Sequence, residues 1–152
     1  MASYMVNPFD PRTVLLAKHA QHVVLVHFPI ALFIVGVAFD LLSRSQRASQ
    51  LGAAAYLNLS AAAIFVLPVI ASGVLAWQLV LNGKPLKGLL LWHFLAACLA
   101  AAMIEASWCV HWRSRKAGRR DLPRYRLTLE VVGVALIALT AHLGGFLSGI
   151  NP

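Results

Sequence analysis

Residues 21–42 read QHVVLVHFPIALFIVGVAFDLL, and they are the clearest indication of the fold class. It contains no Lys, Arg, Asp or Glu before Asp40, and a helix needs about 20 apolar residues to cross the hydrocarbon of a bilayer. Because backbone polar groups in a bilayer must be satisfied within the segment, such a stretch predicts a membrane-spanning helix.

Three further apolar stretches, residues 51–81, 86–112 and 126–147, are separated by short polar or basic segments. The chain is 60% apolar and 12% charged, with a mean hydropathy of +0.75, whereas a soluble domain is about one quarter charged. Short connections make each helix antiparallel to the next. The sequence therefore predicts an all-α fold, a four-helix up-down transmembrane bundle over residues 21–149. Residues 1–20 are expected to form an outer segment that lies in the interface.

The placement of the basic residues predicts the orientation of this bundle. Nine Lys and Arg residues fall at one end, namely Arg44, Arg47, Arg113, Arg115, Lys116, Arg119, Arg120, Arg124 and Arg126. Four fall at the other, namely Arg12, Lys18, Lys84 and Lys87. The positive-inside rule places the nine in the cytoplasm and both termini outside, at the periplasmic face of a bacterial inner membrane. The net charge of +8 thus flanks the spans, which argues against a nucleic-acid-binding surface.

Three histidines, His27, His93 and His142, lie on three different predicted spans at a similar depth. At 1.5 Å per residue this depth is roughly 10 Å below the outer surface. A histidine in hydrocarbon needs a partner, a water-filled cavity or a metal. The first and third helices are diagonal in an up-down bundle, so His27 and His93 are expected to face each other across the core, with His142 approaching from the side.

Two neutral imidazoles on facing helices are typical axial ligands of a b-type haem. Small residues near this depth, among them Gly73, would leave room for a macrocycle, although small residues also permit close helix packing without a cofactor. The histidines could instead hydrogen-bond to one another or to backbone carbonyls, or contact another metal or a quinone. The sequence leaves these alternatives open.

Other ionisable residues fall near the opposite, basic end of the spans. The spacing of Glu130 and Arg126 predicts an i,i+4 ion pair, and Asp40 with Arg44 predicts a second one. His111 is expected to be solvated at the inner surface.

Glu105 has no obvious partner on its own helix, which makes it a candidate for carrying protons to a quinone. Cys98 and Cys109 fall in one predicted helix, about 16 Å apart, so they are too distant for a disulfide. The sequence has no CxxCH motif, which excludes covalent attachment of a c-type haem.

The run from His22 to Leu32, HVVLVHFPIAL, continues to the segment FDLL at residues 39–42. Together they resemble the H-x4-H-F-P-I-A-L opening of the domain-of-unknown-function 2231 family of bacterial membrane proteins. The resemblance extends to residues 67–68, 72–73, 93 and 141–145, and the chain departs from the family's longer G-G-x-L-V-Y ending after Gly145. The resemblance implies a small four-helix inner-membrane unit, in some members joined to Rieske-type or other redox modules. It also implies that His22, His27 and His93 are ligand candidates.

The leading interpretation is a b-type cytochrome-like subunit that exchanges electrons with the quinone pool, a periplasmic cytochrome c or dehydrogenase, or another membrane subunit. His27 and His93 would be the axial ligands, and His142 or His22 the alternatives. The competing interpretations are a cofactor-free accessory subunit of a larger membrane complex and a protein that binds a transition metal through His19, His22 and His27. No nucleophile-base pair, phosphate loop or zinc-protease motif points to independent catalysis.

Overall fold

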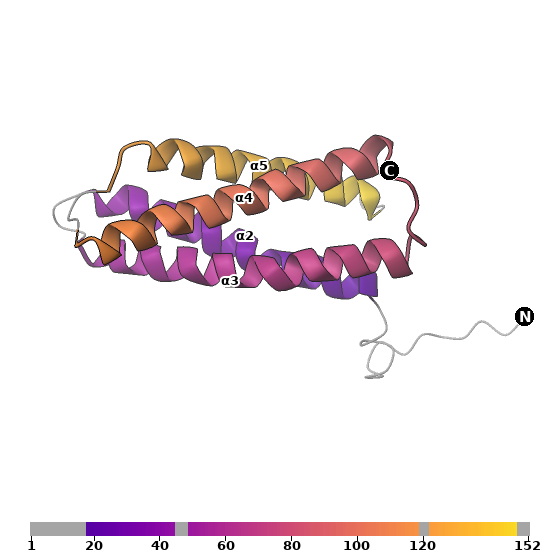
Figure 1. Cartoon of the computed structure of the whole chain (residues 1–152), viewed down its shortest axis with the longest axis horizontal. Coiled ribbons are helices and arrows are strands. Elements are labelled where there is room, and N and C mark those ends of the chain that lie inside the picture. Colours follow the sequence, from indigo (N-terminus) through magenta and orange to yellow (C-terminus); the bar gives the residue numbers. More distant parts are fainter. Residues whose placement is uncertain (1–17, 45–48, 119–121, 149–152) are drawn as a thin grey trace, which may run out of the picture.

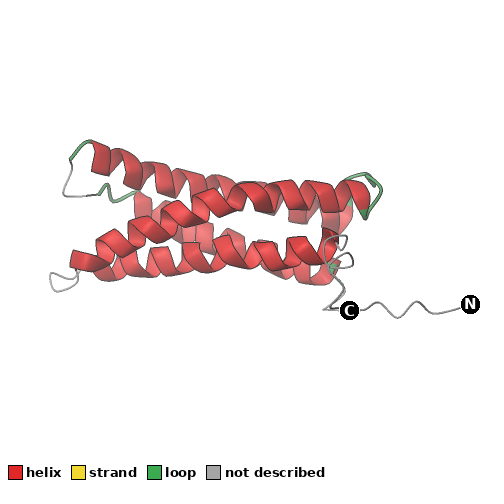
Figure 2. Cartoon of the chain, turned by 90° about the horizontal axis from the view of Figure 1, so that it is seen from below, coloured by secondary structure: helices red, strands yellow, loops and turns green. Residues whose placement is uncertain are grey.

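The computed structural model describes residues 18–44, 49–118 and 122–148, which form four long helices and no strand. These are α2 (Lys18–Ser43), α3 (Ser49–Leu79), α4 (Gly88–Lys116) and α5 (Arg126–Leu147). Each of them is long and apolar enough to cross a membrane. The four helices run along one axis with connections only at the two ends (Figures 1 and 2). The predicted all-α four-helix bundle is therefore confirmed, while the expected interfacial segment, residues 1–20, falls almost wholly outside the described residues.

The turn between α3 and α4 explains where these two helices end and begin. Asn82 and Gly83 have positive φ angles of 50° and 60°, a conformation that stops a right-handed helix. The Trp77 Nε1–H donates to the Lys84 carbonyl oxygen at 2.8 Å and closes the turn. Helix α3 therefore ends two residues before the predicted boundary, and α4 begins two residues after it, at Gly88.

The helices pack as two hairpins. Helix α2 packs most extensively against α3, and α4 against α5, whereas the hairpins meet chiefly through α3 and α4 and less through α2 and α5. Helices α2 and α4 lie diagonally, as expected for an up-down bundle (Figure 1).

We call the end that carries the α2–α3 and α4–α5 connections the basic end. The end with the start of α2, the α3–α4 turn and the end of α5 is the terminal end.

The core of the bundle lies in the half next to the basic end. Its buried apolar side chains are Phe33, Val37, Leu59, Ala62, Ala63, Val66, Ala100, Ala101, Ile104 and Ile137. In the other half, the terminal half (residues 21–32, 67–79, 88–95 and 138–147), only Pro29 and Ala76 are buried. The bundle is thus tightly packed at one end and loosely packed at the other.

Two glycines allow this close packing in the basic half. A Cβ atom on Gly133 of α5 would lie 2.9 Å from two atoms of the Phe33 ring, which comes from α2. A Cβ on Gly36 of α2 would lie 3.0 Å from Leu59 of α3. Since both large side chains are fully buried, each glycine provides the space that its neighbour fills.

Candidate functional site

Four ionisable side chains from three helices meet inside the basic half. Asp40 comes from α2, His111 from α4, and Arg126 and Glu130 from α5. Between 0% and 6% of each of these residues is exposed. Because removing an ion from water costs several kcal/mol, such groups persist in an interior only when they are paired. We call this set the polar cluster.

Hydrogen bonds across the helices hold the polar cluster together. The Arg126 Nε–H donates to Asp40 Oδ2 at 2.8 Å, and the His111 Nε2–H donates to Glu130 Oε1 at 2.9 Å. Arg126 Nη1 also donates to the carbonyl oxygens of Leu122 and Pro123, at 3.2 and 3.4 Å. The first residue of α5 is therefore tied both to its own connection and to the end of α2.

These pairs correct three predictions made from the sequence, two of them from helical spacing. Arg126 pairs with Asp40 of another helix and not with Glu130, and Arg44, the predicted partner of Asp40, is exposed. His111 is 2% exposed and bonded to Glu130, so its predicted solvated position is wrong. The i,i+4 rule considers neighbours on one helix, whereas antiparallel packing places the end of α2 beside the start of α5. The shared position of all four residues near the basic end was the signal that could have revealed the cluster.

The polar cluster is incompletely satisfied. Asp40 Oδ1 and Glu130 Oε2 are buried and have no hydrogen-bond partner among the described residues. The same holds for the hydroxyl of Ser107, which lies one turn before His111 on α4. Asp40 Oδ1 lies 3.9 Å from His111 Nε2, too far for a hydrogen bond. Within the described residues, one guanidinium, that of Arg126, makes an ion pair with one of these two carboxylates, that of Asp40. The second negative charge is therefore removed by a proton on a carboxyl group, or balanced by a protonated His111 or by a further cation.

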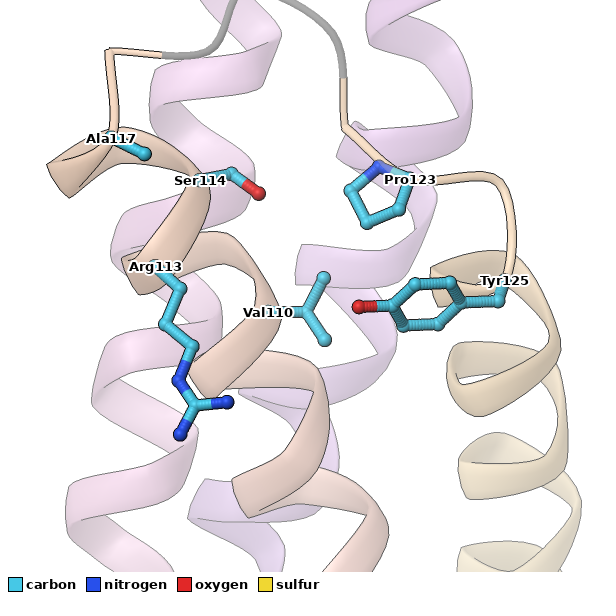
Figure 3. A pocket seen from close by; sticks show the side chains of 6 residues that line it. All are labelled: Val110, Arg113, Ser114, Ala117, Pro123 and Tyr125. Atoms are coloured by element: carbon cyan, nitrogen blue, oxygen red, sulfur yellow. The ribbon is translucent and has the colours of Figure 1, made fainter.

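A pocket of about 260 Å³ lies between the end of α4 and the start of α5. It is lined by Val110, Arg113, Ser114, Ala117, Pro123 and Tyr125. Figure 3 shows the Tyr125 hydroxyl directed toward Val110, while the Arg113 guanidinium turns away along α4. Val110 and Tyr125 are the chain neighbours of His111 and Arg126, so the pocket adjoins the cluster's own elements.

The sequence-predicted histidines lie in the loosely packed terminal half. His93 of α4 is half-buried, and its Nδ1–H donates to the Thr140 carbonyl oxygen of α5 at 3.1 Å. A Cβ atom on Gly144 would lie 3.1 Å from His93 Cε1. His142 is exposed and meets the Phe146 ring edge-on, with the ring centroids 5.0 Å apart. Both histidines therefore contact residues of α5.

Helix α2 carries the other two described histidines of the terminal half. His22 is half-buried, its Nδ1 lies 2.9 Å from Ser72 Oγ of α3, and a Cβ on Gly73 would lie 3.0 Å from its Cε1. His27 is exposed, and its Nδ1–H donates to the Val23 carbonyl oxygen at 2.7 Å. Gly73, which the sequence placed at the depth of the histidines, therefore lies beside His22.

The two hairpins hold separate histidines, and within the described chain no hydrogen bond joins His27 to His93. Glu105 is half-buried on α4 and makes no ion pair with a described residue. The side chain of His19, the remaining predicted metal ligand, lies outside the described residues.

The three Nδ1 contacts define the tautomer of these rings. A carbonyl oxygen only accepts, so His27 and His93 must carry their proton on Nδ1. Ser72 donates its own hydroxyl proton to the Val69 carbonyl oxygen at 2.9 Å, so it accepts from His22 Nδ1. In each neutral imidazole the lone pair is therefore on Nε2, the arrangement found in metal-ligating histidines whose other nitrogen is hydrogen-bonded.

Comparison with known proteins places the chain in a family. The family described as "Predicted membrane protein (DUF2231)" matches residues 18–149, so the chain belongs to this family. A search of curated proteins and a search of solved structures found no match. The match covers all four helices, and it includes both the polar cluster and the terminal-half histidines.

Proposed function

We propose that this DUF2231 family member is an electron-transfer subunit of a bacterial inner membrane, with a b-type haem held by histidines of the terminal half. The observation that carries the proposal is His93, which is bonded through Nδ1 to the Thr140 carbonyl and packs against Gly144. That bond fixes the ring and leaves the Nε2 lone pair for iron. In metal sites such a hydrogen bond also raises the basicity of the ligating histidine.

The second axial ligand would come from α2, which lies diagonally to α4 in the bundle. His27 and His22 both carry the Nδ1–H tautomer that a haem ligand requires. His27 is the ligand expected from the sequence, whereas His22 is half-buried and faces Gly73, as His93 faces Gly144. His142 remains an alternative ligand on α5. The experiment must therefore distinguish which of these four histidines bind the haem iron.

The packing of the bundle supports a cofactor in the terminal half. The basic half has a buried apolar core, whereas the terminal half has almost no buried side chain. A macrocycle between the hairpins would supply apolar contacts that the side chains there do not make with one another. Bound haem would supply one-electron transfer, and the residues of this chain would bind it, orient it and set its axial field.

The proposed partners follow from the position of these histidines. A haem in the terminal half would lie near the outer surface if the nine basic residues of the opposite end are cytoplasmic. A periplasmic cytochrome c or dehydrogenase, or a quinone within the bilayer, would then be within reach. The chain would act as a redox subunit and not as an independent enzyme.

A reduced-minus-oxidised absorbance spectrum of the detergent-purified chain, with a pyridine haemochrome assay, tests this proposal. The wild type is expected to show a b-type α-band that His93→Ala abolishes, together with either His27→Ala or His22→Ala. Trp92→Ala is the matched control, because Trp92 is the neighbour of His93 and is 64% exposed. A folded chain from a haem-sufficient host that contains no haem would overturn the proposal. It would favour the competing function, a cofactor-free accessory subunit of a membrane complex.

A further inference from the structure

The polar cluster places three metal-ligating atoms from three helices close together at the end of the bundle remote from the terminal-half histidines. One nitrogen of His111 and one oxygen each from Asp40 and Glu130 all lie within 4.8 Å of one another. His111 Nε2 is 2.9 Å from Glu130 Oε1 and 3.9 Å from Asp40 Oδ1. Atoms bound to a common ion at about 2.1 Å lie roughly 3–4 Å apart. The three side chains need only small movements to bind one ion.

Two buried oxygens in the polar cluster lack a partner that would satisfy them. Asp40 is 1% exposed and Glu130 is 0% exposed, yet Asp40 Oδ1 and Glu130 Oε2 accept no hydrogen bond from a described residue. Leaving a buried acceptor unsatisfied destabilises the fold, and the cost is larger when the acceptor is charged. A proton would satisfy only one of the two oxygens, whereas a cation bound between the carboxylates would be coordinated by both groups.

Arg126 acts as a support for such a site. Its Nε–H bonds to Asp40 Oδ2, the oxygen that the proposed ion does not use, and so leaves Oδ1 on the side of His111. The guanidinium is itself fixed by the carbonyl oxygens of Leu122 and Pro123. Hydrogen bonds of this kind orient the ligating carboxylates of metal sites.

We propose that Asp40, His111 and Glu130 bind a divalent first-row transition metal ion. One imidazole with two carboxylates suits ions such as Zn²⁺, Mn²⁺ or Fe²⁺, because imidazole favours transition metals over Mg²⁺ and Ca²⁺. The ion would replace the His111–Glu130 hydrogen bond and would link α2, α4 and α5. This site shares no residue with the proposed haem ligands, so either proposal can fail without the other.

Zinc titration of the metal-stripped, full-length chain in detergent, in competition with a chromophoric chelator, tests the site. We expect one Zn²⁺ per wild-type chain, bound at least about 10-fold more weakly after Glu130→Gln or Asp40→Asn. Glutamine keeps the size of Glu130 and still accepts a hydrogen bond from His111, which protects the fold. Glu105→Gln on α4 is the matched control, since it removes the other described glutamate, and it should bind zinc as the wild type does.

The absorbance spectrum of bound Co²⁺ tests the site by a signal that appears on binding, and so it does not depend on loss of binding in a variant. The wild-type complex should show Co²⁺ d–d bands, and His111→Cys should add a thiolate-to-cobalt charge-transfer band. The proposal is overturned if the wild type binds neither ion at a 1:1 ratio, because the cluster then holds only protons or water. It is also overturned if Glu130→Gln binds zinc unchanged, or if only removal of His22 and His93 abolishes binding.

Discussion

Arg126 Nε lies 2.8 Å from Asp40 Oδ2 and joins the first residue of α5 to the last turn of α2. The residues are 86 positions apart in the chain, and neither is more than 6% exposed. The hairpins otherwise meet chiefly through α3 and α4. This ion pair is therefore a principal polar contact between α2 and α5.

Removing one partner of this pair should destabilise the bundle strongly. Arg126→Gln would leave Asp40 as a buried carboxylate without its counter-charge, which costs about 3–5 kcal/mol in comparable pairs. Equilibrium unfolding in mixed SDS micelles measures the change. The matched control is Arg44→Gln, an exposed position whose change should stay within about 0.5 kcal/mol. Equal effects at Arg44 and Arg126 would contradict the cross-helix pair and favour the i,i+4 pair that spacing alone suggests.

Gly133→Ala should destabilise the core because the new Cβ would lie 2.9 Å from the buried Phe33 ring. Overpacking of this kind typically costs about 1–3 kcal/mol. The same unfolding measurement checks this prediction. Gly52→Ala is the control, since the added Cβ would lie 3.8 Å from the Cβ of Ser43, which is an ordinary contact. Phe33→Leu should recover part of the loss in the double variant. An absence of such coupling would show that Phe33 does not pack on Gly133.

The fold could be predicted from the sequence, whereas the pairing of the side chains within the polar cluster could not. Four long apolar stretches specify four spanning helices, because a bilayer leaves few other ways to satisfy the backbone. Helical spacing, however, ranks partners only within one helix, so it assigned Glu130 to Arg126 and Asp40 to Arg44. The true partners depend on how each helix is rotated about its axis. That rotation follows from packing details such as Phe33 on Gly133.

For the histidines too, the sequence predicted how deep each residue lies along its helix but not the direction in which its ring points. The positions of His27, His93 and His142 along the spans predicted a common layer, and all three fall in the terminal half, as does His22. The direction of each ring was not predictable, because it depends on acceptors such as the Thr140 carbonyl on a neighbouring helix. Depth is set by sequence position at a fixed rise per residue, but direction requires tertiary structure.

The glycines beside the histidines provide a test of the proposed haem ligands that leaves every histidine in place. Gly144→Ala would bring a Cβ to 3.1 Å from His93 Cε1, and Gly73→Ala would bring one to 3.0 Å from His22 Cε1. A displaced ligand ring should lower haem affinity by roughly 10-fold, as other disturbances of ligand support do. Haem content per chain, measured by pyridine haemochrome, reports the effect.

The pattern of these two variants would identify the ligand on α2. Loss of haem in both would assign His22 and His93 as the pair, whereas loss in Gly144→Ala alone would assign His27 with His93. Gly52→Ala, where the added Cβ makes only an ordinary contact, should retain full haem. Unchanged haem content in all three variants would remove His93 from the ligand set.

The basic end of the bundle is predicted to face the cytoplasm, and cysteine labelling can test this orientation. In a background of Cys98→Ala and Cys109→Ala, Lys84→Cys places a thiol in the exposed α3–α4 turn, and Arg124→Cys places one in the exposed α4–α5 connection. A membrane-impermeant maleimide should label Lys84→Cys in intact cells, and it should label Arg124→Cys only after permeabilisation. The reason is that nine of the 13 basic residues of the sequence fall at the predicted cytoplasmic end, with Arg124. Labelling the permeabilised cells controls for thiol reactivity. The reverse pattern would place the terminal-half histidines near the cytoplasm, and a cytoplasmic electron donor would then have to replace the periplasmic one.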